Sequence, residues 1–206
     1  VALMGRNGAG KSSLIKALLD VVKYDGSITK RFVKVGYIPQ DANDLLYHQS
    51  VEAECTQTDR DNSLTPGTTA ALLHELATTV NTASHPRDLS EGQRLALVLA
   101  IVLAPKPDLL ILDEPTRGLD YESKSLLTNF LNERSESGAA VLIATHDVEL
   151  VAELASRIII LAEGEVVADG TTLDVLLASP SFAPQVTKVM APRKWLTIAD
   201  VLKAIE

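Results

Sequence analysis

Short apolar segments alternate with amphipathic segments along this chain of 206 residues. Several of the apolar segments carry apolar residues on both faces, which is typical of strands that helices cover on both sides. The predicted strands are residues 1–4, 33–38, 108–113, 139–146 and 157–163. The segments between them favour helices, at residues 11–22, 91–104, 121–137 and 147–156. This order predicts an α/β fold with a mostly parallel sheet and flanking helices.

Three segments depart from this alternation. Residues 158–169 are two apolar runs joined by Glu163-Gly164, a pattern that predicts a terminal hairpin. Residues 41–88 are polar, most of all at 56–69, and predict a small helical insert with a loop. Residues 197–206 open with a Thr-x-x-Asp pattern that resembles a capping box and predicts a short helix.

Composition narrows the class of protein. The formal net charge of −8 argues against a general nucleic-acid-binding surface, which needs a basic field. Cys55 is the single cysteine, so an internal disulfide is excluded and a reducing compartment is favoured. The longest apolar run, residues 95–104, is about half as long as a helix that crosses a bilayer. We therefore expect a cytosolic protein, which a membrane protein could still bind.

The segment Gly5 to Ser12 spells G-x-x-x-x-G-K-S between a predicted strand and a predicted helix. Glycines let a backbone wrap closely around phosphates, and the helix N-terminus adds positive potential. Lys11 would supply a cation for the β- and γ-phosphates, and Ser12 a hydroxyl for Mg²⁺. The alternative is an ordinary strand–turn–helix junction that is rich in glycine. The flanking elements favour the first interpretation, a site for a nucleoside triphosphate.

Asp113 and Glu114 end the apolar strand at 108–113. Carboxylates at the carboxyl end of a strand lie where α/β proteins bind ligands. Asp113 could belong to a magnesium shell, and Glu114 could activate a water for attack on the γ-phosphate. The alternative is that the two carboxylates only cap a helix before Pro115. Because the same chain contains the glycine-rich loop, we favour the role in a nucleotide site.

Gln40 and His146 each follow another predicted strand. At the sheet edge that carries the phosphate loop, either could sense Mg²⁺ or the γ-phosphate. Taken singly, each is better interpreted as a surface residue at a strand end.

The segment D-L-S-E-G-Q-R at residues 88–94 has two interpretations. Ser90 with Gln93 three residues later forms a capping box, and Glu91 suits a helix N-terminus. The same helix start, about twenty residues before the carboxylate strand, also belongs to a recognisable arrangement of motifs.

That arrangement resembles the ATP-binding subunits of ABC transporters. The loop GRNGAGKS, Gln40 as the Q-loop residue, LSEGQ as the signature, LLILDE, Asp120 of the D-loop and His146 as the switch histidine all occur in the family's order. The resemblance covers nearly the whole chain and implies a P-loop NTPase fold of RecA-like type. It implies a core at 1–40 and 105–178, a helical signature subdomain at 41–104 and a tail at 179–206.

The resemblance also implies a role for each motif, with ATP and Mg²⁺ as cofactors. Glu114 would be the general base and His146 would contact the γ-phosphate, with Gln40 counted among the catalytic residues. The phosphate-binding residues would be Gly5, Arg6, Asn7, Gly8, Ala9, Gly10, Lys11, Ser12 and Ser13. The magnesium ligands would be Ser12, Gln40 and Asp113. The residues that complete the nucleotide site of a second domain would be Ser90, Gly92, Gln93 and Asp120.

The implied partners are a second ABC ATPase domain in a head-to-tail dimer, a transmembrane coupling subunit and a substrate-binding membrane subunit, with no nucleic acid. The implied location is the cytoplasmic face of the cell membrane. Glu91 departs from the family, which usually has glycine there. The family's N-terminal strands, with the residue that stacks on adenine, do not precede Val1 in this sequence, so we expect a piece of a longer polypeptide.

A narrower resemblance rests on flanking residues. The segments 39–55 and 113–124 look like the ATPases of energy-coupling factor transporters, which import vitamins and metal ions, and 179–192 looks like the second half of their tandem forms. A DNA-repair ABC ATPase would need a long coiled-coil insertion, for which residues 41–88 are too short. A translation-associated ABC protein and a regulatory nucleotide-binding domain that does not hydrolyse ATP remain open alternatives.

Overall fold

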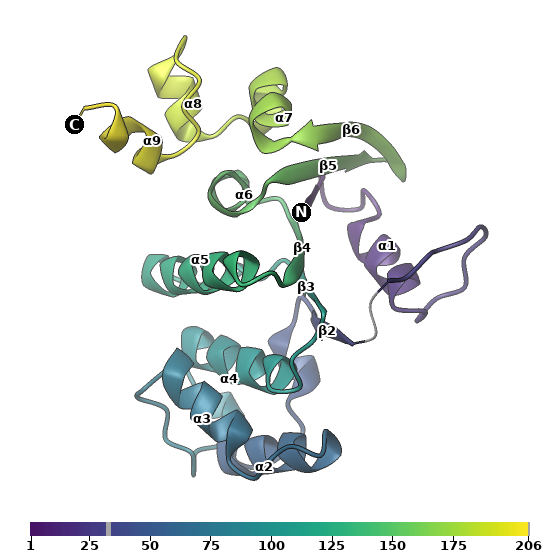
Figure 1. Ribbon diagram of the computed structural model, residues 1–206, viewed down its shortest axis with the longest axis vertical. Helices are drawn as coiled ribbons and strands as arrows, with labels where there is room; N and C mark the ends of the chain where they lie inside the picture. The colour runs from purple at the N-terminus through teal and green to yellow at the C-terminus, as the bar shows by residue number, and fades with distance from the viewer. Residues whose placement is uncertain (32–33, 206) are drawn as a thin grey trace. The chain divides into compact units, whose positions relative to one another are not determined.

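The computed structural model describes residues 1–31 and 34–205 of the chain (Figure 1). The predicted strand at 33–38 and the predicted helix at 197–206 each include one residue, Val33 and Glu206, that lies outside the described residues. The chain divides into two compact units. The first unit comprises Val1–Thr29 with Leu127–Glu206, and the second comprises Lys30–Leu126. The predicted division into core, signature subdomain and tail stays a prediction.

Among the described residues of the first unit, four strands form a sheet. They are β4 (Ala140–Thr145), β1 (Ala2–Met4), β5 (Arg157–Ala162) and β6 (Glu165–Thr171). β1 lies between β4 and β5 and is parallel to both, and β5 pairs with β6 in the antiparallel sense. Glu163 and Gly164 have φ values of 52° and 84°, the left-handed pair that a tight hairpin turn requires. The predicted hairpin is confirmed.

The first unit also contains helices. They are α1 (Lys11–Leu18), α6 (Val148–Leu154), α7 (Thr172–Ala178), α8 (Gln185–Met190), α9 (Ile198–Lys203) and the part of α5 (Tyr121–Glu136) from Leu127 onward. Met4, Ile158 and Leu176 are almost fully buried in one apolar cluster. This cluster joins the sheet to α7, which lies against the hairpin in Figure 1.

The predicted helix at 11–22 is too long. Asp20 has a φ of 58°, and its N–H donates to the carbonyl of Ala17 at 3.1 Å. The N–H of Val21 donates to the carbonyl of Lys16 at 2.8 Å. This pair of hydrogen bonds is a Schellman motif, which ends a helix by turning one residue into the left-handed conformation. The helix therefore ends at Leu18.

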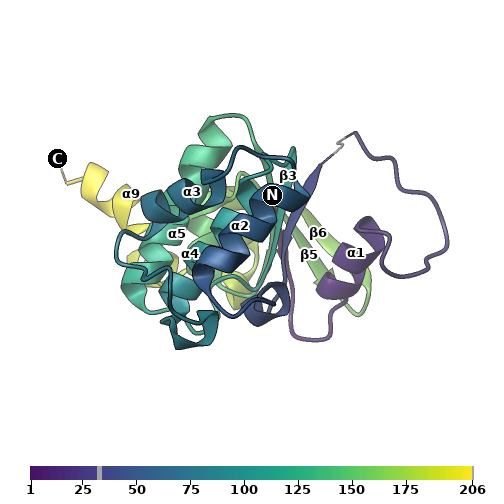
Figure 2. The ribbon, with the colours of Figure 1, turned by 90° about the horizontal axis from the view of Figure 1, so that it is seen from below.

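In the part of the second unit that the structure describes, two parallel strands occur with a group of helices. β2 (Val35–Ile38) pairs with β3 (Leu109–Asp113), with Ile38 opposite Leu112. The helices are α2 (Val51–Asp61), α3 (Thr68–Leu76) and α4 (Glu91–Leu103), with short 3₁₀ turns at Ala42–Leu45 and Pro86–Asp88. Figures 1 and 2 show α2, α3 and α4 side by side. Val51, Leu73 and Leu97 are buried in one apolar cluster of this unit. The predicted helical insert is confirmed.

Asp59 connects α2 to the start of α3. Its side chain is almost fully buried and accepts hydrogen bonds from the N–H of Gly67 at 2.7 Å and of Thr69 at 3.0 Å. The Thr69 hydroxyl donates to it at 2.6 Å. Burial alone would raise the pKa of Asp59, but these hydrogen bonds outweigh burial and lower it below its ordinary value of 3.8. The charged carboxylate therefore stabilises the helical insert.

Cys55 lies in the same helical group. Burial, together with the negative charges of Asp59 and Glu54, raises the pKa of its thiol to about 11. The residue therefore stays a neutral thiol at physiological pH and acts as a small apolar core residue.

The C-terminal part of the chain confirms one prediction and adds two helices. Thr197 and Asp200 form a capping box at the start of α9, as the sequence pattern predicted. The short helices α7 and α8 were not predicted from the sequence. Among the described residues, no helix is long and apolar enough to cross a membrane.

Candidate functional site

The glycine-rich loop joins β1 to α1 in the first unit. Gly5 has a φ of 152°, and a Cβ atom there would lie 2.4 Å from the carbonyl oxygen of Leu161, so glycine is required. Gly10 is the N-cap of α1 in the left-handed conformation and provides no side-chain cap. The first N–H groups of a helix have no intrahelical partner, and together with the helix dipole they favour an anion.

Lys11 places a cation at this loop. Its side chain is 6% exposed, although it is the first residue of α1. The ammonium group donates to the carbonyl oxygen of Gly5 at 2.9 Å and contacts that of Arg6 at 3.5 Å. The loop therefore holds the lysine against its own backbone, where a phosphate would meet both the ammonium and the helix N-terminus.

His146 lies at the same edge of the first unit's sheet as this loop. Met4 of β1 pairs in register with Thr145 of β4, and the two strands are parallel. Gly5 and His146 are the residues that follow this pair, and the imidazole is exposed. The structure thus places the predicted switch histidine beside the start of the phosphate loop.

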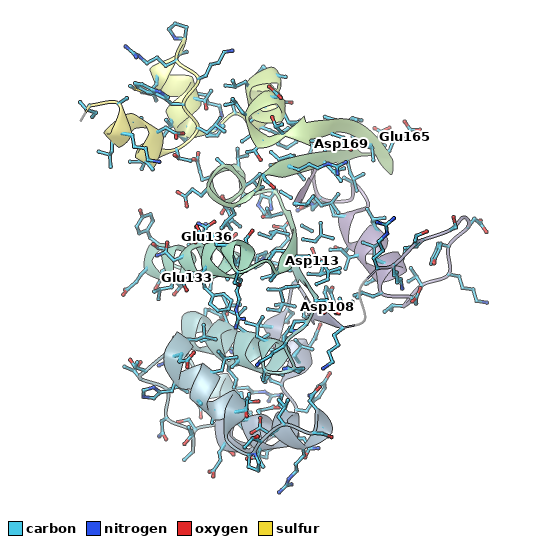
Figure 3. The ribbon with its side chains drawn as sticks, viewed as in Figure 1. Asp108, Asp113, Glu133, Glu136, Glu165 and Asp169 are labelled. Atoms are coloured by element: carbon cyan, nitrogen blue, oxygen red, sulfur yellow. The ribbon has the colours of Figure 1, made fainter. Side chains whose placement is uncertain are left out.

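Asp113 and Glu114 stand at the end of β3 in the second unit. Figure 3 labels Asp113 at this end of the strand and Asp108 at the other. Both side chains of the acidic pair are buried, 2% exposed for Asp113 and 8% for Glu114. Glu114 has a φ of 51°, a strained backbone conformation of the kind that persists at functional sites.

The Oδ1 atom of Asp113 fits a cation ligand. It is buried and, among the described residues, has no hydrogen-bond partner. A buried acceptor without a partner costs free energy, so it indicates a group that binds there. A carboxylate oxygen is a ligand that Mg²⁺ prefers, as are the hydroxyl of Ser12 and the amide oxygen of Gln40.

A cavity of about 320 Å³ in the second unit brings three predicted segments together. Gln40, Glu91 and Glu114 line it, with Arg117 and Leu119 from the turn before α5. Ile38 and Leu112 pair in register, which explains why residues soon after each strand lie close together. The Q-loop residue, Glu114 of the acidic pair and the signature helix of this unit therefore share one cavity.

The signature helix α4 starts with a complete capping box. The N–H of Gln93 donates to the Ser90 hydroxyl at 3.2 Å, and the N–H of Ser90 donates to the Gln93 side chain at 3.1 Å. The capping box predicted from the sequence is confirmed.

Gly92 and Asp120 link α4 to the start of α5. A Cβ atom at Gly92 would lie 2.5 Å from the hydroxyl oxygen of Ser123, so a larger residue there would displace the Ser123 side chain. Asp120 accepts a hydrogen bond from the N–H of Ser123 at 2.8 Å, and the hydrogen bonds from Ser123 lower the pKa of Asp120. The structure thus brings the signature and the D-loop aspartate together.

Sequence reasoning missed the charged neighbours of this cavity. Hydrogen bonds from Asn43 lower the pKa of Asp41, and the positive charges of Arg94 and Arg117 lower it further. Arg94 also forms an ion pair with Glu91. The spacing of Glu91 and Arg94, three residues apart on a helix, was the available signal for this pair.

The structure therefore holds two groups of predicted residues. The loop Gly5–Ser13 and His146 belong to the first unit, and Gln40, the signature, the acidic pair and Asp120 belong to the second. A strand, a glycine-rich loop and a helix with a buried lysine, in a chain with a buried acidic pair at a strand end, define the P-loop class of nucleotide-binding proteins.

Comparison with known proteins identifies the family. The sequence model of the ABC transporter family matches residues 1–117, more than half of the chain. The chain therefore belongs to the ABC transporter ATP-binding family, as the resemblance implied. ATP-binding proteins of this family are ATPases.

The relatives differ in length from this chain. An ABC transporter ATP-binding protein of Streptomyces coelicolor is 54% identical over 218 residues, which cover 100% of this chain and 39% of that protein. The energy-coupling factor transporter ATP-binding protein EcfA of Methanothermobacter thermautotrophicus is 32% identical over 85% of this chain and 62% of its own length. The chain thus spans about two fifths of the Streptomyces relative.

Solved structures share the fold. The structure of cbiO1 from Clostridium perfringens, part of the ABC transporter complex cbiONQ, matches with a TM-score of 0.73 and 26% identity. The match covers 98% of this chain and 86% of that one. The mostly parallel α/β fold predicted from the sequence is therefore confirmed.

Proposed function

We propose that this chain binds and hydrolyses Mg-ATP and so energises an energy-coupling factor type ABC transporter that takes up a vitamin or a metal ion. The observation that carries the proposal is the buried acidic pair Asp113 and Glu114, with its strained backbone, in a chain that also holds Lys11 at a glycine-rich helix start. A binding loop without these carboxylates would support nucleotide binding alone.

The residues of the first unit bind the triphosphate. The backbone of Gly5–Ser13 surrounds the β- and γ-phosphates, and the Lys11 ammonium turns from the Gly5 carbonyl to the phosphate oxygens. The phosphate oxygens carry negative charge and the Gly5 carbonyl does not, so the attraction between opposite charges favours this exchange. His146, beside the start of this loop, contacts the γ-phosphate.

The residues of the second unit carry out the chemistry. Glu114 accepts the proton of the attacking water, and Asp113 and Gln40 would provide oxygen ligands for Mg²⁺. When bound, Mg²⁺ neutralises part of the charge that develops on the phosphate oxygens. General base catalysis of this kind contributes about 10²–10⁴-fold to the rate.

The proposal includes a second ATPase domain. Ser90, Gly92 and Gln93 face the ATP bound by that domain, and Asp120 borders the same contact. The length of the Streptomyces relative leaves room for both domains in one polypeptide. The matches to EcfA and to cbiO1 of the cbiONQ complex favour an assembly with a transmembrane coupling subunit and a substrate-binding membrane subunit at the cytoplasmic face of the cell membrane.

Reconstitution tests this proposal. The full-length polypeptide is combined in liposomes with the membrane subunits encoded beside it, and ATP hydrolysis and uptake of labelled vitamins and metal ions are measured. We expect Mg-dependent hydrolysis and uptake of one such substrate, both lost in Glu114→Gln. Tight ATP binding without hydrolysis in the assembled complex would instead favour a regulatory nucleotide-binding domain.

A further inference from the structure

The Arg94 side chain, in the first turn of α4, makes polar contacts with several residues that precede it in the sequence. Its side chain is only 12% exposed. One terminal nitrogen of the guanidinium donates to the carbonyl oxygens of Leu89 at 2.9 Å and Arg87 at 3.3 Å, and Nε contacts that of Pro86 at 3.5 Å. The other terminal nitrogen donates to Glu91 at 2.8 Å. One side chain thus ties the loop before α4 to the first turn of α4.

The acceptors of Arg94 surround the signature. Residues 86–89 lead directly into Ser90, the N-cap of α4, and Glu91 is the first residue of the helix. Backbone carbonyls impose a fixed geometry on a planar guanidinium, because its N–H groups point in set directions. The position of Ser90 and Gly92 therefore depends on Arg94 as well as on the capping box.

Glu91 adds a negative charge at this helix start. Its side chain is 59% exposed, and exposed ion pairs contribute little to stability. The effect of the pair is instead electrostatic, because the Arg94 guanidinium at 2.8 Å offsets the charge of the carboxylate. An unpaired carboxylate at the same place would repel an approaching triphosphate.

We propose that Arg94 is a positioning residue for the ATP bound by the second domain: it fixes the loop that carries Ser90 and neutralises Glu91. This inference rests on the proposed function, in which the signature completes the partner's nucleotide site. Arg94 acts through Ser90 and Gly92 and does not itself contact the nucleotide.

The two parts of this role separate in a set of variants. Arg94→Gln removes both the tether and the neutralising charge, whereas Arg94→Lys keeps the charge and loses the planar fork. Glu91→Gly leaves Arg94 on its carbonyl acceptors and removes the carboxylate. The double variant lacks the tether but has no unpaired carboxylate.

The experiment measures the ATP concentration for half-maximal hydrolysis, kcat and thermal stability in the reconstituted full-length assembly. We expect Arg94→Gln to raise that concentration roughly tenfold at low salt, because the carboxylate of Glu91 is then unpaired next to the triphosphate. Arg94→Lys should raise it less, and the double variant should recover to within about threefold of the wild type. The Arg94→Gln defect should also shrink at high salt, which screens exposed charges.

Two results would overturn the inference. One is an Arg94→Gln assembly that melts earlier but needs no more ATP than the wild type, since that outcome describes a structural residue only. The other is a defect that neither Glu91→Gly nor high salt relieves. In both cases the proposed function would still stand if the wild-type assembly hydrolyses ATP and Lys11→Ala abolishes that hydrolysis. A wild-type assembly without hydrolysis would remove the proposed function and this inference together.

Discussion

Two helices of this molecule begin in opposite ways. α1, in the first unit, starts after Gly10, which has no side chain to cap the helix, and its first residue is the buried cation Lys11. α4, in the second unit, starts with a complete capping box at Ser90, and its first residue is the acidic Glu91. A helix N-terminus is stabilised by side-chain caps and by negative charge, and a cation there is unfavourable.

The start of α4 therefore follows the rules of helix stability, and the start of α1 contradicts them. The contradiction indicates that α1 is arranged for a ligand, because an anion at its start would supply both the missing cap and the missing negative charge. The capping box and Glu91 already stabilise the start of α4 without a ligand. The contribution of α4 to a nucleotide site therefore depends on the position of its first residues. The variants below test this difference.

The largest effect is expected at the carboxylate that acts on the bound nucleotide. Glu114→Gln keeps the size of the side chain and removes its basicity, so turnover should fall by about 10²–10⁴-fold while ATP still binds. Steady-state hydrolysis by the full-length assembly measures the loss. Glu122→Gln, an exposed residue in the first turn of α5, is the matched control and should leave the rate unchanged. Near wild-type turnover in Glu114→Gln would assign the base to another residue.

The next effect separates ligand binding from helix stability at α1. Lys11→Ala removes the ammonium that faces the phosphates, and affinity for a fluorescent ATP analogue should fall by roughly 10–100-fold, as expected for charge-assisted hydrogen bonds. Thermal stability without nucleotide should change little, because the loss of the hydrogen bond to the Gly5 carbonyl offsets the removal of an unfavourable cation at a helix N-terminus. Lys16→Ala in the last turn of α1 is the control. Equal binding by both variants would refute the role of the loop as a phosphate cradle.

Asp59 should show the reverse behaviour, since its carboxylate serves only the helical insert. Asp59→Ala leaves the N–H groups of Gly67 and Thr69 without their acceptor, and we expect a loss of about 2 kcal/mol in the free energy of unfolding. ATP affinity should not change. Asp61→Ala, an exposed carboxylate of the same helix, should cost less than about 0.5 kcal/mol.

The contribution of Asp59 also depends on pH. Its pKa is lower in the folded protein than the ordinary value of 3.8, so the unfolded chain binds the proton more tightly. The stabilisation is fully present above the ordinary pKa and disappears as the pH falls through the lower, folded value. Urea titrations of the wild type and Asp59→Ala should therefore converge under acid conditions. A constant difference between them down to the lowest pH would contradict a charged Asp59.

The smallest effect is expected at Glu91. Because Arg94 offsets its charge, Glu91→Gly should change the ATPase rate of the full assembly by less than about threefold, which is under 1 kcal/mol. Glu91→Ala is the companion variant that separates the loss of charge from the added backbone freedom of glycine. A tenfold rise in rate would identify Glu91 as a brake on one of two unequal ATP sites.

The sequence predicted those features that depend on local rules. Strand positions follow from apolar runs, the hairpin turn from Glu163-Gly164, and both helix starts with capping boxes from residues three positions apart. Gln40 and Glu114 follow the parallel strands β2 and β3 of the second unit, and Gly5 and His146 follow the parallel strands β1 and β4 of the first, so each pair obeys the rule that parallel strands end at a common edge.

Other features have no local signal. The end of α1 depends on Asp20 adopting a left-handed conformation that glycine or asparagine more often adopts. The helices α7 and α8 have seven and six residues, too few for a clear period. Arg94 donates to backbone carbonyls of a loop, and every residue type has a backbone carbonyl, so the sequence does not reveal these acceptors. The strain at Glu114 is likewise a property of the folded backbone.

The most direct test of the central claim is the identity of the nucleotide that the full-length protein retains. Glu114→Gln and the double variant Lys11→Ala/Glu114→Gln are incubated with labelled Mg-ATP, passed through a desalting column and extracted. Both proteins also carry a substitution that abolishes ATP binding by the second domain, so that labelled nucleotide is retained only at this chain's site. The account predicts that Glu114→Gln retains unhydrolysed ATP and that the double variant retains almost none. Recovery of ADP from Glu114→Gln, or equal retention by the two variants, would contradict it.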